Sequence, residues 1–155
     1  MSNFDGIPAE DWVAMHNAVM DYAAGIDTLD MDLFRTVFTE DVLLTYGEDW
    51  APMKGIDALV SFVDPFHRRL NGTHHQTTNF RVSAYDGTTA TTHCSVAALL
   101  LVNDAPGGDW FVRHGFYIDK WTRTADGWKI HHRDFRPLFD TGNLSILEFE
   151  WEPEG

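Results

Sequence analysis

Four long runs of alternating apolar and polar residues dominate the second half of the chain and constrain the fold more than any other feature. The runs cover residues 77–85, 88–102, 110–124 and 128–139, and the short segments DG, NDAPGGD and ADG separate them. Alternation with a period of two is typical of β-strands, and short Asp-Gly or Gly-rich segments between strands are typical of hairpin turns. We therefore predict one antiparallel, meandering sheet in this part of the chain.

The first part of the chain shows helical periodicity instead. Apolar residues recur at steps of three and four from Pro8 to Ile26, which indicates an amphipathic helix with one buried face. This helix should end near Asp27. A second helix is expected over residues 31–38, with Asp30 as its N-cap.

A short strand and a third helix complete the predicted elements. The strand is expected over residues 42–46 and the helix over residues 55–69, where Pro65 should kink or break it. Helices followed by a long sheet define an α+β domain. A long antiparallel sheet tends to curl around such helices, and we expect a cleft between the two layers.

The composition and net charge limit the kinds of partner that this domain can bind. At 155 residues, with 44% hydrophobic and 14% aromatic residues, the chain should bury a core and form one domain over residues 1–155. Eleven basic and twenty-four acidic residues give a net charge of −13, which repels phosphate backbones and anionic lipids. The single cysteine, Cys94, excludes an internal disulfide, no zinc-type spacing occurs, and neither a signal-peptide pattern nor an apolar run of membrane-spanning length is found. We expect a cytoplasmic protein with no nucleic-acid partner, no membrane contact and no metal site.

The segment THHQTTN, residues 73–79, raises the question of chemistry, because it places two adjacent histidines just before a strand-like run. Taken alone, the segment favours a polar loop with solvated imidazoles over a working base. If the segment is extended, His74 and His75 point in opposite directions.

The last strand-like run is also rich in polar residues. Its parity assigns Lys129, His131, Arg133 and Phe135 to one face and Ile130, His132 and Asp134 to the other. Parity does not say which face is inside. Histidines on these strands are more often hydrogen-bonded structural residues than metal ligands.

Four segments of the chain contain motifs whose order along the sequence matches that of a known family. They read YAAGIDTLDMDLFRTVFTEDV, GIDALVSF, HHQTTNFRV and GFYIDKWTRTADGWKIHHRDF. Together they resemble the SnoaL-like branch of the NTF2-like superfamily over almost the whole chain. The resemblance implies a cone-shaped α+β barrel, in which a long curved antiparallel sheet wraps around three N-terminal helices. Enzymes of this fold, among them hexachlorocyclohexane dehydrochlorinase, scytalone dehydratase and bile-acid dehydratase, mostly transfer protons, so no cofactor is expected.

The resemblance also implies roles for individual residues. The motifs of the dehydrochlorinase match Gly25-Ile26-Asp27, His75 with Asn79, and Trp128 with Arg133. By that match Asp27 orients His75, His75 removes a proton, and Arg133 stabilises the leaving group or developing anion. The dehydratases add a tyrosine on the first helix, which matches Tyr22 and would donate to a leaving oxygen.

The chemistry of these residue types agrees with the implied roles. An imidazole has a reference pKa of about 6.5, and a carboxylate bonded to one ring nitrogen fixes the tautomer and stabilises the imidazolium. A buried arginine keeps its charge and stabilises an anion. Each residue also has a plainer interpretation: Asp27 as a helix end, Arg133 as a salt-bridge partner of one of many acids, and Tyr22 as part of the core.

We therefore expect an acid–base enzyme that carries out an elimination such as dehydration, or an isomerisation or cyclisation, on a small apolar ring compound such as a polyketide, terpenoid or steroid. The catalytic candidates are Tyr22, Asp27, His75 and Arg133. The substrate-binding candidates are Trp50, Phe62, Asn79, Tyr117 and Phe135. Two alternatives stay open: a non-catalytic ligand-binding or assembly domain, and the small subunit of a ring-hydroxylating dioxygenase. We also expect a homo-oligomer, dimer or trimer, formed through the outer face of the sheet.

Overall fold

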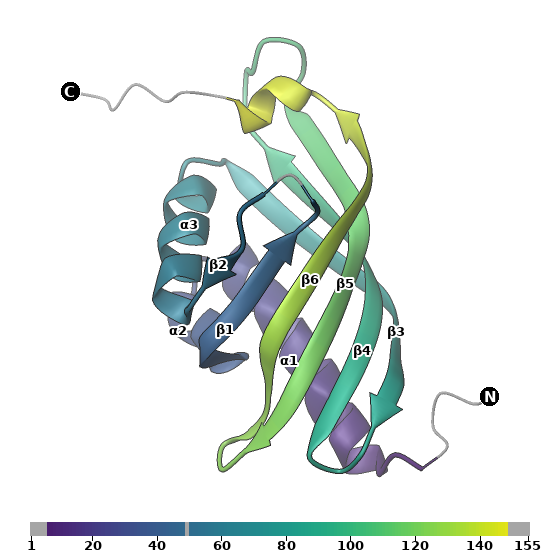
Figure 1. Cartoon of the computed structure of the whole chain (residues 1–155). Helices are drawn as coiled ribbons and strands as arrows, with labels where there is room; N and C mark the ends of the chain where they lie inside the picture. Colours follow the sequence, from purple (N-terminus) through teal and green to yellow (C-terminus); the bar gives the residue numbers. More distant parts are fainter. Residues whose placement is uncertain (1–5, 49, 149–155) are drawn as a thin grey trace.

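A six-stranded curved sheet wraps around the helices in the computed structural model, which describes residues 6–48 and 50–148 (Figure 1). The strand order is β2-β1-β6-β5-β4-β3, and the sheet stays open rather than closing into a barrel. The four strands β3 to β6 form the antiparallel meander that was predicted for the second half of the chain. Strand β1 joins this sheet parallel to β6, a pairing that the sequence did not predict. The strands are β1 (Phe38–Tyr46), β2 (Met53–Lys54), β3 (Gly72–Tyr85), β4 (Thr89–Leu101), β5 (Trp110–Thr124) and β6 (Gly127–Gly142).

The helices cover one face of this sheet. Helix α1 (Ala9–Asp27) runs along the sheet, and α2 (Met31–Thr36) and α3 (Ile56–Arg68) pack beside β1 and β2 (Figure 1). A short 3₁₀ helix, η1 (Leu144–Leu147), follows β6. The α+β architecture predicted from the sequence is confirmed. No helix within the described ranges has the length and apolar character needed to cross a membrane.

Helix α1 follows the predicted periodicity. Met15, Val19, Tyr22 and Ile26 are buried at steps of three and four, and the helix ends at Asp27 as expected. Asp30 is the N-cap of α2, because its side chain accepts a hydrogen bond of 3.0 Å from the Leu33 main-chain N–H.

Other boundaries differ from the predictions. Helix α2 ends at Thr36, so Phe38 begins β1 instead of closing the helix. Helix α3 continues past Pro65, which lies near its C-terminal end and so removes only one main-chain hydrogen bond from the last turns. Strand β3 already begins at Gly72 and pairs with β4, so the loop interpretation of residues 73–79 is wrong.

Two irregularities decide which side chains face the helices. In β3, Asn79 has a positive φ of 57° and the register shifts between Thr78 and Arg81. In β6, consecutive residues of β5 pair with Ile130 and His132, so His131 is an extra residue. Ile130 and Arg133 are therefore both buried, and the parity prediction is wrong across His131. Beyond His131 it holds, because Arg133 and Phe135 both line the cavity, and His132 and Asp134 both bond to Thr45.

The buried apolar residues form two clusters between the helices and the sheet. The larger one surrounds α1 and includes Trp121, Phe34 and Met15, and the smaller one lies at the other end of the sheet around Phe111 and Ile146. The two clusters do not fill the whole interior, because a cavity lies where they meet.

Gly25 controls how closely α1 approaches α2. A Cβ atom at this position would lie 2.8 Å from the Phe34 main-chain nitrogen and 3.0 Å from the Asp30 carbonyl oxygen. Alanine is preferred over glycine inside a helix by about 1 kcal/mol, but overpacking against main-chain atoms that cannot rotate away costs about 1–3 kcal/mol. The balance of the two effects is a loss of up to about 2 kcal/mol, so we expect Gly25→Ala to lower the free energy of unfolding by up to this amount in urea denaturation.

The exposed neighbour Ala24 provides a control that changes helix propensity alone. Ala24→Gly changes helix propensity without filling space and should lower stability by about 1 kcal/mol. A Gly25→Ala protein as stable as the wild type or more stable would contradict the close approach.

Candidate active site

A cavity of about 350 Å³ lies between α1, α3 and the concave face of the sheet. Its volume is in the range that holds a small organic ligand, and most of its wall is apolar or aromatic. The wall includes seven of the residues proposed from the sequence, namely Tyr22, Trp50, Phe62, His75, Tyr117, Arg133 and Phe135. These seven side chains come from α1, α3, three strands (β3, β5 and β6) and the connection between β1 and β2, and the fold brings them together.

Asp27 and His75 form a hydrogen-bonded pair at this wall. Asp27 Oδ1 lies 2.7 Å from His75 Nδ1, and Asp27 Oδ2 accepts a bond of 2.8 Å from the His75 main-chain N–H. A carboxylate at this distance accepts, so Nδ1 carries the ring proton and Nε2 keeps its lone pair. The aspartate thus fixes both the tautomer and the position of the imidazole.

The two adjacent histidines have different surroundings. The side chain of His75 is 5% exposed, whereas that of His74 is 61% exposed, with its Nδ1 3.6 Å from Asp27 Oδ2. The two rings therefore differ in exposure, although both have Nδ1 near the Asp27 carboxylate. Of these two histidines, only His75 lines the cavity.

Arg133 takes part in a buried ion pair. Its Nε and Nη2 donate hydrogen bonds of 2.7 and 2.8 Å to the two carboxylate oxygens of Asp119, and both side chains are almost fully buried. The salt-bridge interpretation of Arg133 is therefore confirmed. Its third nitrogen, Nη1, is buried without a hydrogen-bond partner.

Two tyrosines enclose the arginine. The guanidinium carbon of Arg133 lies 4.1 Å from the ring centre of Tyr22 and 4.0 Å from that of Tyr117, which is close cation–π geometry. The two hydroxyl groups are 3.0 Å apart and share a hydrogen bond. Burial raises the pKa of both hydroxyls, more than the nearby Arg133 cation lowers it, so both stay protonated at neutral pH.

The structure adds polar residues that sequence reasoning missed. His67 lines the cavity, donates from Nδ1 to the Val63 carbonyl oxygen at 2.8 Å, and has its ring centre 5.8 Å from that of His75. Burial lowers the pKa of His67, so its ring is neutral near pH 7. His67 follows Val63 by four residues, and this spacing on the predicted helix would have placed it on the buried face.

Arg113 is the second missed polar residue. It forms a bidentate ion pair with Asp140, at 2.9 and 2.8 Å, and its Nη1 donates to the Tyr46 hydroxyl at 2.9 Å. No motif in the sequence signals this group, because the partners come from three different strands. Both arginines that line the cavity are therefore already paired with carboxylates.

Two proposed site residues do not line the cavity: Asp27, which reaches it through His75, and Asn79, which has no contact with this site. Asn79 is exposed at the irregularity of β3, and its amide donates to Ser95 Oγ at 3.4 Å. Its distance of four residues from His75 predicts the same face only for a regular strand. The shift after Thr78 breaks the alternation, and Phe80 packs against the core instead.

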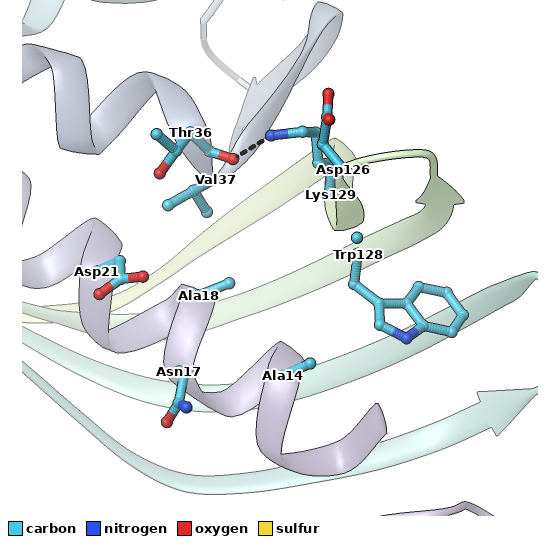
Figure 2. Close-up of a pocket in the computed structure, with 10 residues that line it drawn as sticks. Ala14, Asn17, Ala18, Asp21, Thr36, Val37, Asp126, Trp128 and Lys129 are labelled. Carbon is cyan, nitrogen blue, oxygen red and sulfur yellow. Dashed lines mark hydrogen bonds between the residues drawn. The ribbon is translucent and has the colours of Figure 1, made fainter. Parts of the chain in front are cut away.

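A second hollow lies outside the sheet–helix interior. Figure 2 shows Asn17, Ala18 and Asp21 of α1 on one side and Trp128 and Lys129 of β6 on the other, with Lys129 bonded to the Thr36 carbonyl oxygen. This hollow is open to solvent and contains no hydrogen-bonded acid–base pair among its lining residues. Within the described ranges, no group of three or more His, Cys, Asp or Glu side chains is arranged to hold a metal ion.

Comparisons with known proteins agree with this architecture. The sequence profile of the SnoaL-like domain family matches residues 8–134. A fungal relative, the terrestric acid biosynthesis cluster protein E of Penicillium crustosum, is 28% identical over 139 residues, which cover 86% of this chain and 87% of that protein.

Solved structures show the same fold. A protein of Novosphingobium aromaticivorans assigned as an aromatic ring hydroxylase superposes with a TM-score of 0.80 and 29% identity, over 90% of this chain and 98% of that one. A hexachlorocyclohexane dehydrochlorinase of Novosphingobium barchaimii superposes with a TM-score of 0.72 and 18% identity, over 91% of this chain and 93% of that one.

The buried pair between Arg133 and Asp119 makes a stability prediction. Asp119→Asn leaves a buried, unpaired guanidinium, and breaking such a pair costs about 3–5 kcal/mol. Arg136→Gln, three residues along the same strand, removes a pair whose arginine is 65% exposed and should change stability by less than about 1 kcal/mol. The free energies of unfolding of the two variants, Asp119→Asn and Arg136→Gln, would be measured by urea titration and compared. Equal effects would show that the buried pair contributes no more than the surface one.

Proposed function

This chain belongs to the SnoaL-like domain family, and on that basis we propose that it is a cofactor-independent acid–base enzyme acting on a small, largely apolar ring compound. The observation that carries the proposal is the Asp27–His75 pair at the wall of an apolar cavity. The family supports a small-molecule enzyme-like domain. The residues of this chain support the reaction type.

His75 is the proposed general base. Because Nδ1 donates to Asp27, Nε2 is the ring atom with a lone pair to accept a proton from the substrate. Asp27 then stabilises the imidazolium that forms, and it holds the ring in place through the second bond to the His75 main chain. Tyr22 and Arg133 supply hydrogen bonding and positive charge to the reacting group.

The reaction that we propose is an elimination such as dehydration, with isomerisation or cyclisation as the related outcomes of the same proton abstraction. The relative from a biosynthesis cluster and the structural similarity to a dehydrochlorinase both support chemistry on small molecules. Polyketide, terpenoid and steroid rings have the size and apolar character that the cavity wall favours.

The alternative of a non-catalytic binding domain explains less of the site. Such a domain needs the cavity, but it has no need of a buried imidazole whose tautomer is fixed by a carboxylate. The similarity to a protein assigned as an aromatic ring hydroxylase favours, as a second candidate, the small subunit of a ring-hydroxylating dioxygenase. A small subunit would need a large partner chain for activity. Turnover by the isolated chain would therefore favour the cofactor-independent enzyme over the dioxygenase subunit.

The proposed base can be tested by substitution. His75→Ala should lower turnover by about two to four orders of magnitude, the usual contribution of a positioned base. Asp27→Asn should have a comparable effect, because the amide can donate to the ring and favour the wrong tautomer. Turnover would be measured on a panel of hydroxylated and chlorinated alicyclic, terpenoid and polyketide compounds.

The control for this experiment is the adjacent histidine. His74→Ala removes an exposed ring outside the cavity and should keep turnover near that of the wild type. Near-wild-type rates for both His75→Ala and Asp27→Asn, on a compound that the native protein converts, would rule out the proposed mechanism.

We also propose that the protein self-associates through the outer face of the sheet. Phe116 and Phe139 are 41% and 52% exposed on neighbouring strands of this face, where Phe139 stacks on His114. Sedimentation at micromolar concentration should give a species larger than the 17.6 kDa chain, and Phe116→Glu should shift it toward the monomer. Val13→Glu, at an exposed apolar residue on α1, is the control. A monomeric wild-type protein would contradict this interface.

A further inference from the structure

Two imidazoles in the cavity wall each have one nitrogen that can accept a hydrogen bond from a ligand. His67 of α3 lies with Nδ1 2.8 Å from the Val63 carbonyl oxygen, which can only accept, so Nδ1 carries the proton and Nε2 of the neutral ring has the lone pair. His75 is held in the same tautomer, because its Nδ1 faces Asp27 Oδ1 at 2.7 Å. Within residues 6–48 and 50–148, no donor is bonded to either Nε2 atom.

One ligand can reach both rings. His67 and His75 both line the cavity, and their ring centres are 5.8 Å apart, with the ring planes inclined at 41°. A separation of this size is comparable with the width of one substituted six-membered ring. His67 is held in place by its bond to Val63 and by edge contact with Phe66, with ring centres 5.2 Å apart. The two acceptors therefore act on the same bound molecule.

The other polar side chains of the wall do not compete as acceptors. An arginine has donors only, and both cavity arginines are paired with carboxylates. The Tyr46 hydroxyl oxygen already accepts from Arg113 Nη1 at 2.9 Å, and the hydroxyls of Tyr22 and Tyr117 bond to each other. In the described part of the wall, the two imidazoles are thus the acceptors best placed for a donor group of a ligand.

The charge state of His67 favours an uncharged donor. Burial lowers the pKa of His67 more than its bond to Val63 raises it, so the ring is neutral near pH 7 and offers no charge to an anion. A ligand that covers Nε2 with C–H groups leaves this acceptor desolvated and unpaired, which costs binding free energy. A site with such an acceptor therefore discriminates against analogues that lack a hydroxyl group.

We infer that His67 is a specificity-determining residue, and that the substrate is an uncharged ring compound with a hydroxyl group that donates to His67 Nε2 while the C–H bond that breaks lies at His75 Nε2. This inference rests on the proposed role of His75 and specifies its substrate class. Since the two imidazoles are separated by 5.8 Å, the hydroxyl group and the reacting C–H belong to different carbon atoms of the ring. A hydrocarbon or chlorinated ring without a hydroxyl group would leave His67 unpaired.

The test uses orcinol, an uncharged benzene ring with two hydroxyl groups on alternate carbon atoms, together with its monomethyl and dimethyl ethers. One hydroxyl group reports on His67, and the other takes the place of the reacting C–H at His75. Calorimetry would give the dissociation constants. In the wild type, each of the two methylation steps should weaken binding by about threefold to tenfold, the usual contribution of one hydrogen bond.

Variants of His67 assign one of these two steps. His67→Phe keeps an aromatic ring but has no acceptor, so orcinol and its monomethyl ether should bind alike, whereas the dimethyl ether should still bind about threefold to tenfold more weakly. His67→Gln has an amide oxygen that can accept and should restore the missing step. The nitrogen NMR signal of His67 Nε2 should shift with orcinol but not with the dimethyl ether, a response that a purely structural histidine would not give. His74→Ala, at an exposed ring outside the cavity, is the control and should keep both steps.

The result for His67 is separate from the result for the proposed base, which turnover by His75→Ala tests. If His75→Ala keeps turnover while His67→Phe loses one methylation step, the base is wrong and the hydroxyl-binding site stands. The inference is overturned if the wild type does not bind orcinol, if the wild type binds the dimethyl ether as tightly as orcinol, or if His67→Phe retains both steps. None of these three results would change the conclusion on the base.

Discussion

The buried ion pair between Arg133 and Asp119 is the interaction on which the rest of the site depends. Removing two charges from water costs several kcal/mol per ion, and only good geometry offsets this cost. The geometry comes from direct register pairing of Asp119 in β5 with Arg133 in β6, which brings the two side chains together with two parallel hydrogen bonds. Tyr22 then packs on the cation from α1, so the position of the pair also fixes the helix against the sheet.

Helix α1 links this ion pair to the proposed catalytic pair, Asp27 and His75. Tyr22 contacts Arg133, and Asp27, five residues further along, holds both the main chain and the ring of His75. Gly25, between them, allows the close approach of α2. The four residues proposed for the reaction therefore lie on a helix and two strands rather than on loops, which favours fixed positions and preorganised hydrogen bonds.

Periodicity in the sequence predicts the α+β architecture, the extent of α1 and the position of Asp27, because these depend on local patterns. It does not predict the extra residue His131 or the shift at Asn79, because such irregularities depend on the paired strand. The direction of Arg133 and the exclusion of Asn79 follow from those irregularities. The parallel pairing of β1 with β6 and the ion pair of Arg113 likewise join distant segments, and no local pattern signals them.

The charge of the molecule and the charge of the cavity favour the same kind of ligand. The chain carries a net charge of −13, so its outer field repels anions at a distance of up to about a Debye length. Inside, both cavity arginines are paired with carboxylates, and the aromatic wall gains its binding energy from apolar area. An uncharged ring compound avoids the repulsion outside, and its burial excludes water from the Asp27–His75 pair. In the proposed mechanism, exclusion of water strengthens the interaction of the Asp27 carboxylate with the imidazolium that forms, so the apolar wall contributes to the chemistry as well as to binding.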